Sequence, residues 1–167
     1  GATSALTVDL SSAGAGTVTG TGYGTTSFAH IEKLTTGAGD DTFTYSSSDS
    51  TAYEIEGGTG SDKLNYAAAG ATSALTVDLS SAGAGTVTGT GYGTTSFSNI
   101  EKLTTGSGDD TFTYSSSDST AYNIEGGAGS DKLNYAAAGA TSAMTVNLTS
   151  AGTGTVTGNG YGTTSFS

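Results

Sequence analysis

The sequence predicts an all-β protein in which the chain winds as a β-solenoid between two parallel sheets. A segment of 69 residues recurs, apolar residues come in short runs, and no apolar spacing of 3.6 residues persists for three turns. Gly, Ser and Thr supply 85 of the 167 residues, which disfavours helices. Val, Ile, Leu, Phe and Tyr recur at regular intervals, as they do not in disordered linkers. We therefore expect a folded chain of short strands.

The 69-residue repeat is nearly exact. Residues 1–69 and 70–138 agree at 64 of 69 positions, and residues 139–167 begin a third copy. The five differences between the first two copies are Ala29/Ser98, His30/Asn99, Ala38/Ser107, Glu54/Asn123 and Thr59/Ala128. We expect the three segments to form one continuous solenoid, because tandem copies bury their apolar faces by stacking on one another.

Each copy is expected to contain six strands, because six short runs are separated by clusters of Gly, Ser and Asp. In the first copy these runs are residues 6–10, 17–19, 27–34, 42–45, 54–56 and 63–66. An even number of strands predicts about three two-strand coils per copy, so that each copy meets the same environment. At a strand spacing of about 4.8 Å, one copy would lengthen the solenoid by roughly 14 Å.

Alternation along these strands predicts a thin apolar core. The inward side chains of the first copy are expected to be Val8, Val18, Phe43, Ile55 and Leu64. Phe28, Ile31 and Leu34 are spaced by three residues instead of two, which predicts a bend or bulge in that segment. Such a narrow core provides little hydrophobic stabilisation, so we expect the turns to contribute as well.

The charge and composition of the chain disfavour several classes of function. Four Lys and Arg residues against 15 Asp and Glu give a net charge of −11, which repels nucleic acid and anionic lipid. No run of 18 apolar residues could span a membrane. The chain contains no Cys, which removes disulfides and is typical of large bacterial proteins exported without oxidative folding.

Four nonapeptides supply the main chemical signal. Residues 57–65 and 126–134 follow the pattern G-G-x-G-x-D-x-U-x, and residues 36–44 and 105–113 follow it with Thr in place of the first Gly. Gly allows a tight turn that directs carbonyl oxygens inward, and Asp adds an anionic oxygen of the kind that Ca²⁺ prefers. One turn cannot provide six to eight ligands, so Asp40 or Asp41 is expected to share an ion with Asp62 of the neighbouring turn.

On these nonapeptides the chain resembles the RTX family of secreted bacterial proteins, whose nonapeptides form a right-handed parallel β-roll with calcium between successive turns. The resemblance covers about 36 of the 167 residues. Here the nonapeptides alternate with longer segments, and the turn at residues 11–16, which has no carboxylate, is expected to bind no metal. With the neighbouring aspartates included, the implied calcium ligands are Gly37, Gly39, Asp40, Asp41, Gly57, Gly58, Gly60, Asp62, Gly106, Gly108, Asp109, Asp110, Gly126, Gly127, Gly129 and Asp131.

Other readings of these features remain open. Gly-Asp turns also cap strands without any metal. Threonine pairs at Thr17/Thr19 and Thr42/Thr44 form rows of the kind found in ice-binding solenoids, although Lys63 and Asn65 lie in the intervening coil. β-Propensity on a wet face would explain the same threonines.

No residue pattern indicates catalysis. The single histidine, His30, becomes Asn99 in the second copy, and Glu54 of the Glu54/Glu56 pair becomes Asn123. The Gly-rich segment at residues 20–24 lacks the helix and the lysine of a phosphate loop and is expected to form a turn. We therefore expect no enzyme activity.

We expect an extracellular or cell-surface structural repeat of a bacterial protein, stabilised by calcium. It would serve as a stalk, a fibre, or a module of an adhesin, surface layer or biofilm matrix. Type I-like secretion would deliver the acidic chain to millimolar Ca²⁺, where it would fold. The alternative is an RTX module that assists export or substrate contact of a secreted enzyme. Unpaired strands at solenoid ends also predict end-to-end self-association.

Overall fold

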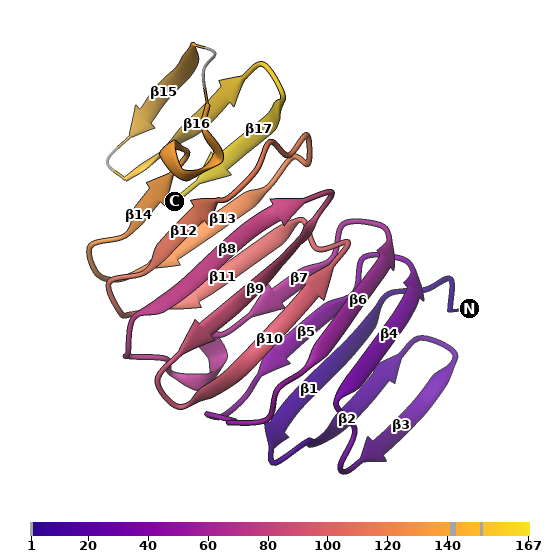
Figure 1. Ribbon diagram of the computed structural model, residues 1–167. Coiled ribbons are helices and arrows are strands. Elements are labelled where there is room, and N and C mark those ends of the chain that lie inside the picture. Colours follow the sequence, from indigo (N-terminus) through magenta and orange to yellow (C-terminus); the bar gives the residue numbers. More distant parts are fainter. Residues whose placement is uncertain (1, 141–142, 151) are drawn as a thin grey trace.

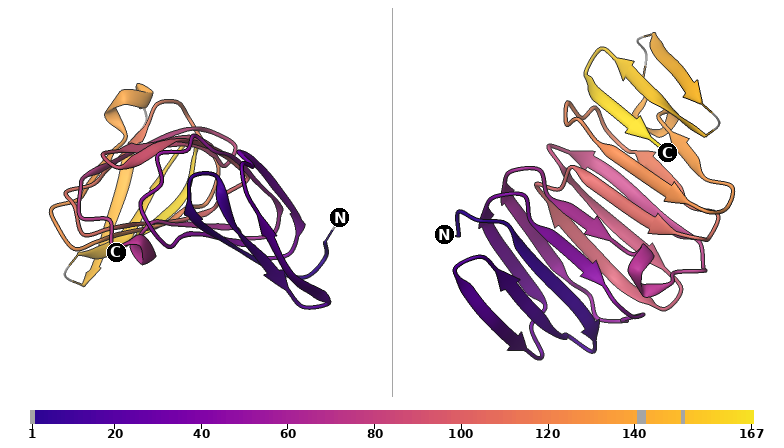
Figure 2. Two further views of the ribbon diagram at one scale, coloured as in Figure 1. Left: turned by 90° about the horizontal axis from the view of Figure 1, so that it is seen from below. Right: turned by 180° about the vertical axis from the view of Figure 1, so that it is seen from behind.

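The computed structural model describes residues 2–140, 143–150 and 152–167, which form 17 strands in two sheets together with two short 3-10 helices (Figure 1). The long sheet has the strand order β15-β16-β17-β13-β11-β7-β5-β1-β2-β3, and the short sheet has the order β14-β12-β8-β9-β10-β6-β4. The two sheets face one another along the length of the molecule (Figure 2). The protein is therefore all-β, as the sequence predicts.

Each complete copy of the repeat forms seven strands and one 3-10 helix. The first copy contains β1 (Leu6–Ser12), β2 (Ala15–Gly20), β3 (Tyr23–Phe28), β4 (Lys33–Ala38), β5 (Thr42–Tyr45), β6 (Glu54–Thr59), β7 (Lys63–Asn65) and η1 (Ala67–Ala69). The second contains β8 (Leu75–Ser81), β9 (Ala84–Gly89), β10 (Tyr92–Ser98), β11 (Lys102–Gly106), β12 (Thr111–Tyr114), β13 (Asn123–Gly127), β14 (Lys132–Asn134) and η2 (Ala136–Ala138). The third contributes β15 (Met144–Ser150), β16 (Thr153–Gly158) and β17 (Tyr161–Phe166).

The sheets are mixed, whereas the sequence analysis expected parallel ones. The first three strands of each copy form an antiparallel meander, as in β1, β2 and β3. The other pairings between described strands are parallel, including β4 with β6 and β5 with β7. Residues 27–34, expected to be one strand, contribute instead to two, since β3 ends at Phe28 and β4 begins at Lys33. The chain bends at His30, which has a φ of 56°, and this bend separates β3 from β4 where the spacing by three residues predicts it.

Seven strands per copy, instead of the expected six, make successive copies exchange sheets. The meander of the first copy lies in the long sheet, that of the second copy in the short sheet, and that of the third copy again in the long sheet. Because the sheets face one another, this exchange is a half-turn about the long axis combined with a shift along it. Equivalent residues keep equivalent surroundings through the half-turn, and the prediction of three whole coils per copy is wrong.

The alternation also changes the length that one copy adds. Two complete copies supply seven strands to each sheet, so one copy advances the structure by half of seven strand spacings. At about 4.8 Å between strands this is roughly 17 Å, compared with the 14 Å expected from three coils.

The predicted inward side chains fill the space between the sheets. Val8, Phe43, Ile55 and Leu64 are each at most 1% exposed. Val18, in the meander at the end of the long sheet, is only half-buried, whereas its counterpart in the second copy, Val87, is buried. The core around this residue is thus complete where another copy precedes it.

A tyrosine cluster joins the first copy to the second. The rings of Tyr45 and Tyr66 stack with their centroids 4.3 Å apart, and Tyr92 of the second copy packs edge-on against both rings. The hydroxyls of Tyr45 and Tyr66 both hydrogen-bond to the Thr95 hydroxyl, at 2.6 and 2.9 Å. Burial raises the pKa of Tyr45 to about 12, so this hydroxyl stays protonated. The second copy makes the same cluster with the third, around Thr164.

Candidate metal centre

The structure places the Gly-Asp turns of each copy side by side, in the arrangement that the sequence analysis expected. Strands β4 and β6, which lead into the two turns of the first copy, are parallel and pair Gly37 with Gly58. Strands β5 and β7, which follow the turns, pair Thr42 with Lys63. The second copy repeats this arrangement with the Gly106–Gly127 and Thr111–Lys132 pairs.

Close stacking of the turns explains several of the motif glycines. A Cβ atom on Gly58, which has a φ of 100°, would lie 2.0 Å from the Gly37 carbonyl oxygen. A Cβ atom on Gly60, with a φ of 140°, would lie 2.1 Å from the carbonyl oxygen of Gly39. Gly57 leaves room for the side chain of Asp62, because its Cβ would lie 2.5 Å from Asp62 Oδ2. The equivalent contacts recur in the second copy, at Gly126, Gly127 and Gly129.

The carboxylates form a column that runs across neighbouring turns. The Leu6 N–H donates to Asp41 Oδ1 at 2.6 Å, and the Asp41 N–H donates to Asp62 Oδ1 at 2.7 Å. The Asp62 N–H in turn donates to Glu101 Oε2 at 2.9 Å, so the column crosses from the first copy into the second. Each acidic side chain therefore caps a backbone N–H of the adjacent turn.

The second copy builds the same column with one difference. The Leu75 N–H donates to Asp110 Oδ1 at 2.7 Å, and the Asp110 N–H donates to Asp131 Oδ1 at 2.9 Å. Asp131 is exposed, whereas its counterpart Asp62 is fully buried beneath the second copy. Two chemically identical positions thus differ only in whether a following turn covers them.

The buried carboxylates of the columns keep one oxygen without a partner. Asp41, Asp62 and Asp110 are each at most 1% exposed. Among the described residues, nothing donates a hydrogen bond to the Oδ2 atom of any of the three. Burial raises the pKa of Asp62 despite the hydrogen bond from Asp41 N–H, and repulsion from the Asp41, Glu101 and Asp40 carboxylates raises it further. The column therefore concentrates negative charge that the described side chains do not neutralise.

Asp40 and Asp109 lie outside these buried columns. Asp40 Oδ1 accepts a hydrogen bond from the Ser61 N–H at 2.9 Å, and Asp109 Oδ1 accepts one from the Ser130 N–H at 2.8 Å. Both side chains are exposed and join neighbouring turns at the surface. Of the two aspartates expected to share an ion with Asp62, the structure thus places Asp41 in the interior and Asp40 outside.

The residues suit a hard cation in charge and in donor type. The Oδ1 atoms of the buried aspartates accept hydrogen bonds from backbone N–H groups, which is the strand-capping role that needs no metal. Their Oδ2 atoms remain available as anionic oxygens for a cation. Within residues 2–140, 143–150 and 152–167, no three acidic or histidine side chains gather closely enough to hold a metal by themselves. A bound Ca²⁺ would therefore also need carbonyl oxygens or water.

Asp49 is a structural carboxylate that the sequence analysis missed. It caps the turn at residues 11–16, the turn without its own carboxylate: the Ala13 N–H donates to Asp49 Oδ1 at 3.1 Å. The Thr51 N–H donates to the same oxygen at 2.9 Å, and the Tyr53 hydroxyl donates to Oδ2 at 2.8 Å. Burial alone would raise the pKa of Asp49, but these hydrogen bonds outweigh it and lower the pKa. Asp118 repeats the contacts in the second copy.

The sequence holds a local signal for this cap, because Asp favours an Asx turn, in which its side chain accepts from the backbone N–H two residues further on. The capped turn itself lies 36 residues away in the chain, so sequence spacing alone does not connect them.

Comparison of the chain with family models, curated proteins and solved structures finds no match. In the part of the chain that the structure describes, no helix has the length and apolar character needed to cross a membrane.

Proposed function

We propose that this chain is a structural repeat module of a secreted protein, a right-handed β-solenoid of the RTX β-roll type that calcium stabilises. Such a module would form a stalk, a fibre, or part of an adhesin, surface layer or biofilm matrix outside a bacterial cell. It would carry no catalytic site. The proposal rests on how the copies bury one another.

The burial of equivalent residues carries the structural role. Ile31, in the first copy, is 41% exposed, whereas its counterpart Ile100 is fully buried against the first copy. Ile100 is therefore buried where another copy precedes it, and one continuous core runs from copy to copy. This behaviour suits a protein that gains length by adding identical units.

Calcium would act on the charge of the columns. The free oxygens of Asp41 and Asp62 in the first copy, and of Asp110 and Asp131 in the second, would hold the ion together with carbonyl oxygens of the turns. A bound Ca²⁺ would neutralise carboxylates that burial and mutual repulsion now disfavour. The folded chain would then be more stable outside the cell, where calcium is millimolar, than inside it.

The strand register weakens the ice-binding alternative. Thr19, Thr7 and Thr42 lie side by side in one row of the long sheet, but Lys63 follows them directly. In the adjacent row, Asp9 separates Thr17 from Thr44. Neither row continues as an unbroken array of threonines.

Calcium-dependent stability tests the proposal. We expect thermal unfolding of the full chain, followed by circular dichroism, to shift upward when a chelator is replaced by Ca²⁺. At a free calcium concentration of 100 times Kd, one site adds about 2.7 kcal/mol. Isothermal titration should show the binding directly, with Mg²⁺ as the control cation. Identical melting curves with chelator and with calcium, together with no heat of binding, would contradict calcium stabilisation.

A further inference from the structure

The strands that join the first copy to the second place a turn of the second copy beside Asp62. Strand β6 pairs with β10 in the short sheet, and β7 pairs with β11 in the long sheet. The connection between β10 and β11, residues 99–101, therefore lies next to the Gly-Asp turn between β6 and β7. The Asp62 N–H donates to Glu101 Oε2 at 2.9 Å, and the Lys102 N–H donates to the Asp62 carbonyl oxygen at 2.9 Å. These contacts form the junction between the two copies.

At this junction, the first glycine of the nonapeptide leaves a space that two oxygen atoms face. A Cβ atom on Gly57 would lie 2.5 Å from Asp62 Oδ2 and 2.3 Å from the Asn99 carbonyl oxygen. Asp62 is fully buried, and its Oδ2 atom has no hydrogen-bond partner among the described residues. Glu101 adds a second carboxylate at the same turn. Two carboxylates and a carbonyl oxygen thus come together where the copies meet.

The equivalent space between two turns of the same copy is closed by threonine. Thr36 stands where the next nonapeptide has Gly57, and its hydroxyl donates to the Gly57 carbonyl oxygen at 2.6 Å. Thr105 donates to the Gly126 carbonyl oxygen in the same way, at 2.9 Å. Within a copy, a hydroxyl therefore satisfies the carbonyl oxygen of the neighbouring turn. At the junction glycine replaces that threonine, so this position offers no hydroxyl to the Asn99 carbonyl oxygen.

We propose that a divalent cation of the size of Ca²⁺ binds at the junction between copies, held by Asp62 Oδ2 of one copy and by the Asn99 carbonyl oxygen and the Glu101 carboxylate of the next. This inference deepens the proposed calcium role and rests on it, because it makes the following copy a source of ligands. Asn99 and Glu101 lie outside the nonapeptides, so the motif does not identify them.

The donor atoms suit a hard cation. Ca²⁺ binds six to eight oxygens at about 2.3–2.6 Å and accepts carboxylates, backbone carbonyls and water together. Asp62 Oδ2 and the Asn99 carbonyl oxygen both lie within 2.5 Å of one point, so a single ion near that point can contact both. Lys102 Nζ donates to the Ser61 carbonyl oxygen at 3.3 Å, and among the described residues it forms no ion pair with either carboxylate. The negative charges of the junction are therefore left for a cation.

A cation in this position would couple calcium binding to the stacking of copies. It would bridge two carboxylates that repel each other across the junction, and it would do so once in every 69 residues. Removing calcium would then weaken the contact between copies, whereas the turns within one copy would keep their threonine hydrogen bonds.

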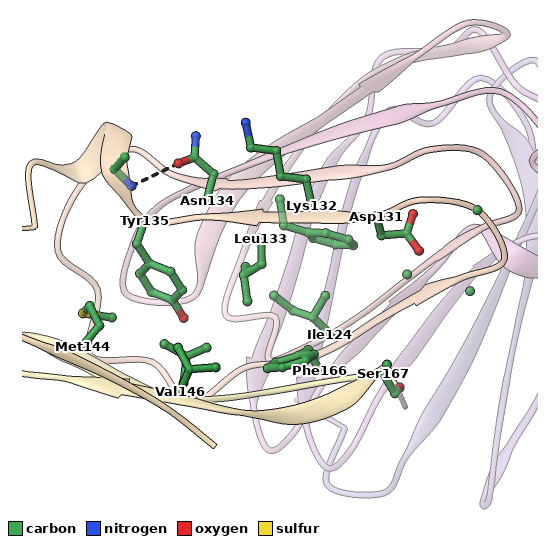
Figure 3. Close-up of a pocket in the computed structure, with 17 residues that line it drawn as sticks. Ile124, Asp131, Lys132, Leu133, Asn134, Tyr135, Met144, Val146, Phe166 and Ser167 are labelled. Atoms are coloured by element: carbon green, nitrogen blue, oxygen red, sulfur yellow. Dashed lines mark hydrogen bonds between the residues drawn. The ribbon is translucent and has the colours of Figure 1, made fainter. Parts of the chain in front are cut away.

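The second copy contains one half of the same site. A Cβ atom on Gly126 would lie 2.4 Å from Asp131 Oδ2, and both residues line one cavity between the sheets (Figure 3). The counterparts of Asn99 and Glu101, 69 residues further on, lie beyond residue 167. In a chain of these 167 residues, Asp131 therefore provides an internal comparison for Asp62.

Glu101→Gln tests the junction site in the full chain. The amide keeps the size of the side chain and an acceptor for the Asp62 N–H, while the charge disappears. Glu125→Gln is the matched control, since it makes the same change of charge on the exposed outer face of β13. Circular dichroism checks that both variants fold.

Isothermal titration with Ca²⁺ measures the result. We expect Glu101→Gln to weaken calcium binding at least about tenfold and Glu125→Gln to change it less than about twofold. Asp62→Asn is a second variant for the same site and should weaken binding at least as much as Glu101→Gln. Asp131→Asn should weaken it less than either of these two variants.

NMR spectra of the wild-type chain locate the ion without any substitution. Calcium should shift the amide signals of Asp62 and of residues 99–101, whereas the counterpart residues 30–32 in the first copy should shift little. Mg²⁺ is the control cation, because it demands a near-ideal octahedral site and gives up its water reluctantly.

Two results separate this inference from the calcium role on which it rests. Equal calcium binding by Glu101→Gln and Glu125→Gln, with amide shifts confined to the nonapeptides, would overturn the junction site and leave calcium stabilisation intact. A wild-type chain that shows neither heat of binding nor amide shifts would refute calcium stabilisation itself.

Discussion

Asp62 offers the sharpest test of the carboxylate column, because its two oxygens have different roles. Asp62→Ala removes the acceptor of the Asp41 N–H, a hydrogen bond of 2.7 Å. Asp41 and the Asp62 side chain are both buried, so water does not reach the space that the substitution leaves and this donor stays without a partner. Leaving a buried donor unsatisfied costs about 1–3 kcal/mol. For a chain of this size, that cost lowers Tm by about 2–12 °C.

Asp62→Asn separates the hydrogen bond from the charge. The amide oxygen can still accept from the Asp41 N–H, while the buried negative charge disappears. Because the folded-state pKa of Asp62 lies above its ordinary value of 3.8, its stabilising contribution is present at low pH and is lost as pH rises through the folded-state pKa. At pH 7 in chelator, we therefore expect Asp62→Asn to be at least as stable as wild type. In calcium, both variants should gain less stability than wild type does.

Urea unfolding at pH 7, followed by circular dichroism with chelator and with calcium, measures these differences. Asp131→Ala is the matched control, since Asp131 makes the same bond to the Asp110 N–H at 2.9 Å but is exposed. Asp110 is as buried as Asp41, but the Asp131 side chain that covers its N–H is exposed, so water can fill the space that the substitution leaves and we expect a loss below about 1 kcal/mol. Equal losses for Asp62→Ala and Asp131→Ala would refute the reasoning from burial. A large loss for Asp62→Asn in chelator would refute the reasoning from charge.

Three further substitutions test other parts of the structure. Thr95→Val removes the shared partner of two buried tyrosine hydroxyls and should lower the free energy of unfolding by about 1–3 kcal/mol in urea, whereas Thr26→Val, at the exposed equivalent position, should change little. The folded state lowers the pKa of Asp49, so the stability that this carboxylate contributes is present above its ordinary pKa of 3.8 and is lost as pH falls through the folded-state pKa. Asp49→Asn should therefore destabilise the chain at pH 7 and reduce the dependence of its stability on pH in the acid range. Gly58→Ala would place a Cβ atom 2.0 Å from a carbonyl oxygen and should prevent close stacking of the turns, whereas Gly70→Ala, also at positive φ but with open space around it, should cost only about 1 kcal/mol of backbone strain in the same urea assay.

Local patterns in the sequence predict much of the core and the position of the turns. Alternation identifies Val8, Phe43, Ile55 and Leu64 as inward residues, and the structure confirms this. The spacing of the nonapeptides also brings Asp41 beside Asp62. These predictions succeed because they depend on residues within one strand or on two neighbouring turns of the same copy.

The alternation of sheets could not be predicted in this way, because it depends on a single strand. Residues 23–28 contain only one large apolar side chain at an inward position of the strand, Phe28, since the other inward residue, Thr26, is polar. Its counterpart Thr95 is fully buried because two tyrosine hydroxyls from another copy bind it. A polar residue buried by long-range hydrogen bonds does not fit an apolar alternation. Missing this strand gives six strands per copy instead of seven. An even number would place every copy in the same sheets, whereas the odd number makes successive copies exchange sheets.

The cap at Asp49 likewise could be predicted only in part from the sequence. The residues that it binds lie both two residues away and 36 residues away. Only the nearer contact leaves a pattern in the sequence. The farther contact exists because the fold places the turn at residues 11–16 beside the segment that follows β5.

The exchange of sheets between copies is tested most directly by crosslinking, since the chain has no native cysteine. Lys63 of β7 and Lys102 of β11 are register partners in the long sheet, whereas Thr86 of β9 lies in the short sheet. Three whole coils per copy would instead place β9 next to β7. With a short thiol crosslinker, Lys63→Cys/Lys102→Cys should crosslink rapidly within one molecule, and Lys63→Cys/Thr86→Cys should not. Efficient crosslinking of the second pair without the first would contradict the alternating arrangement.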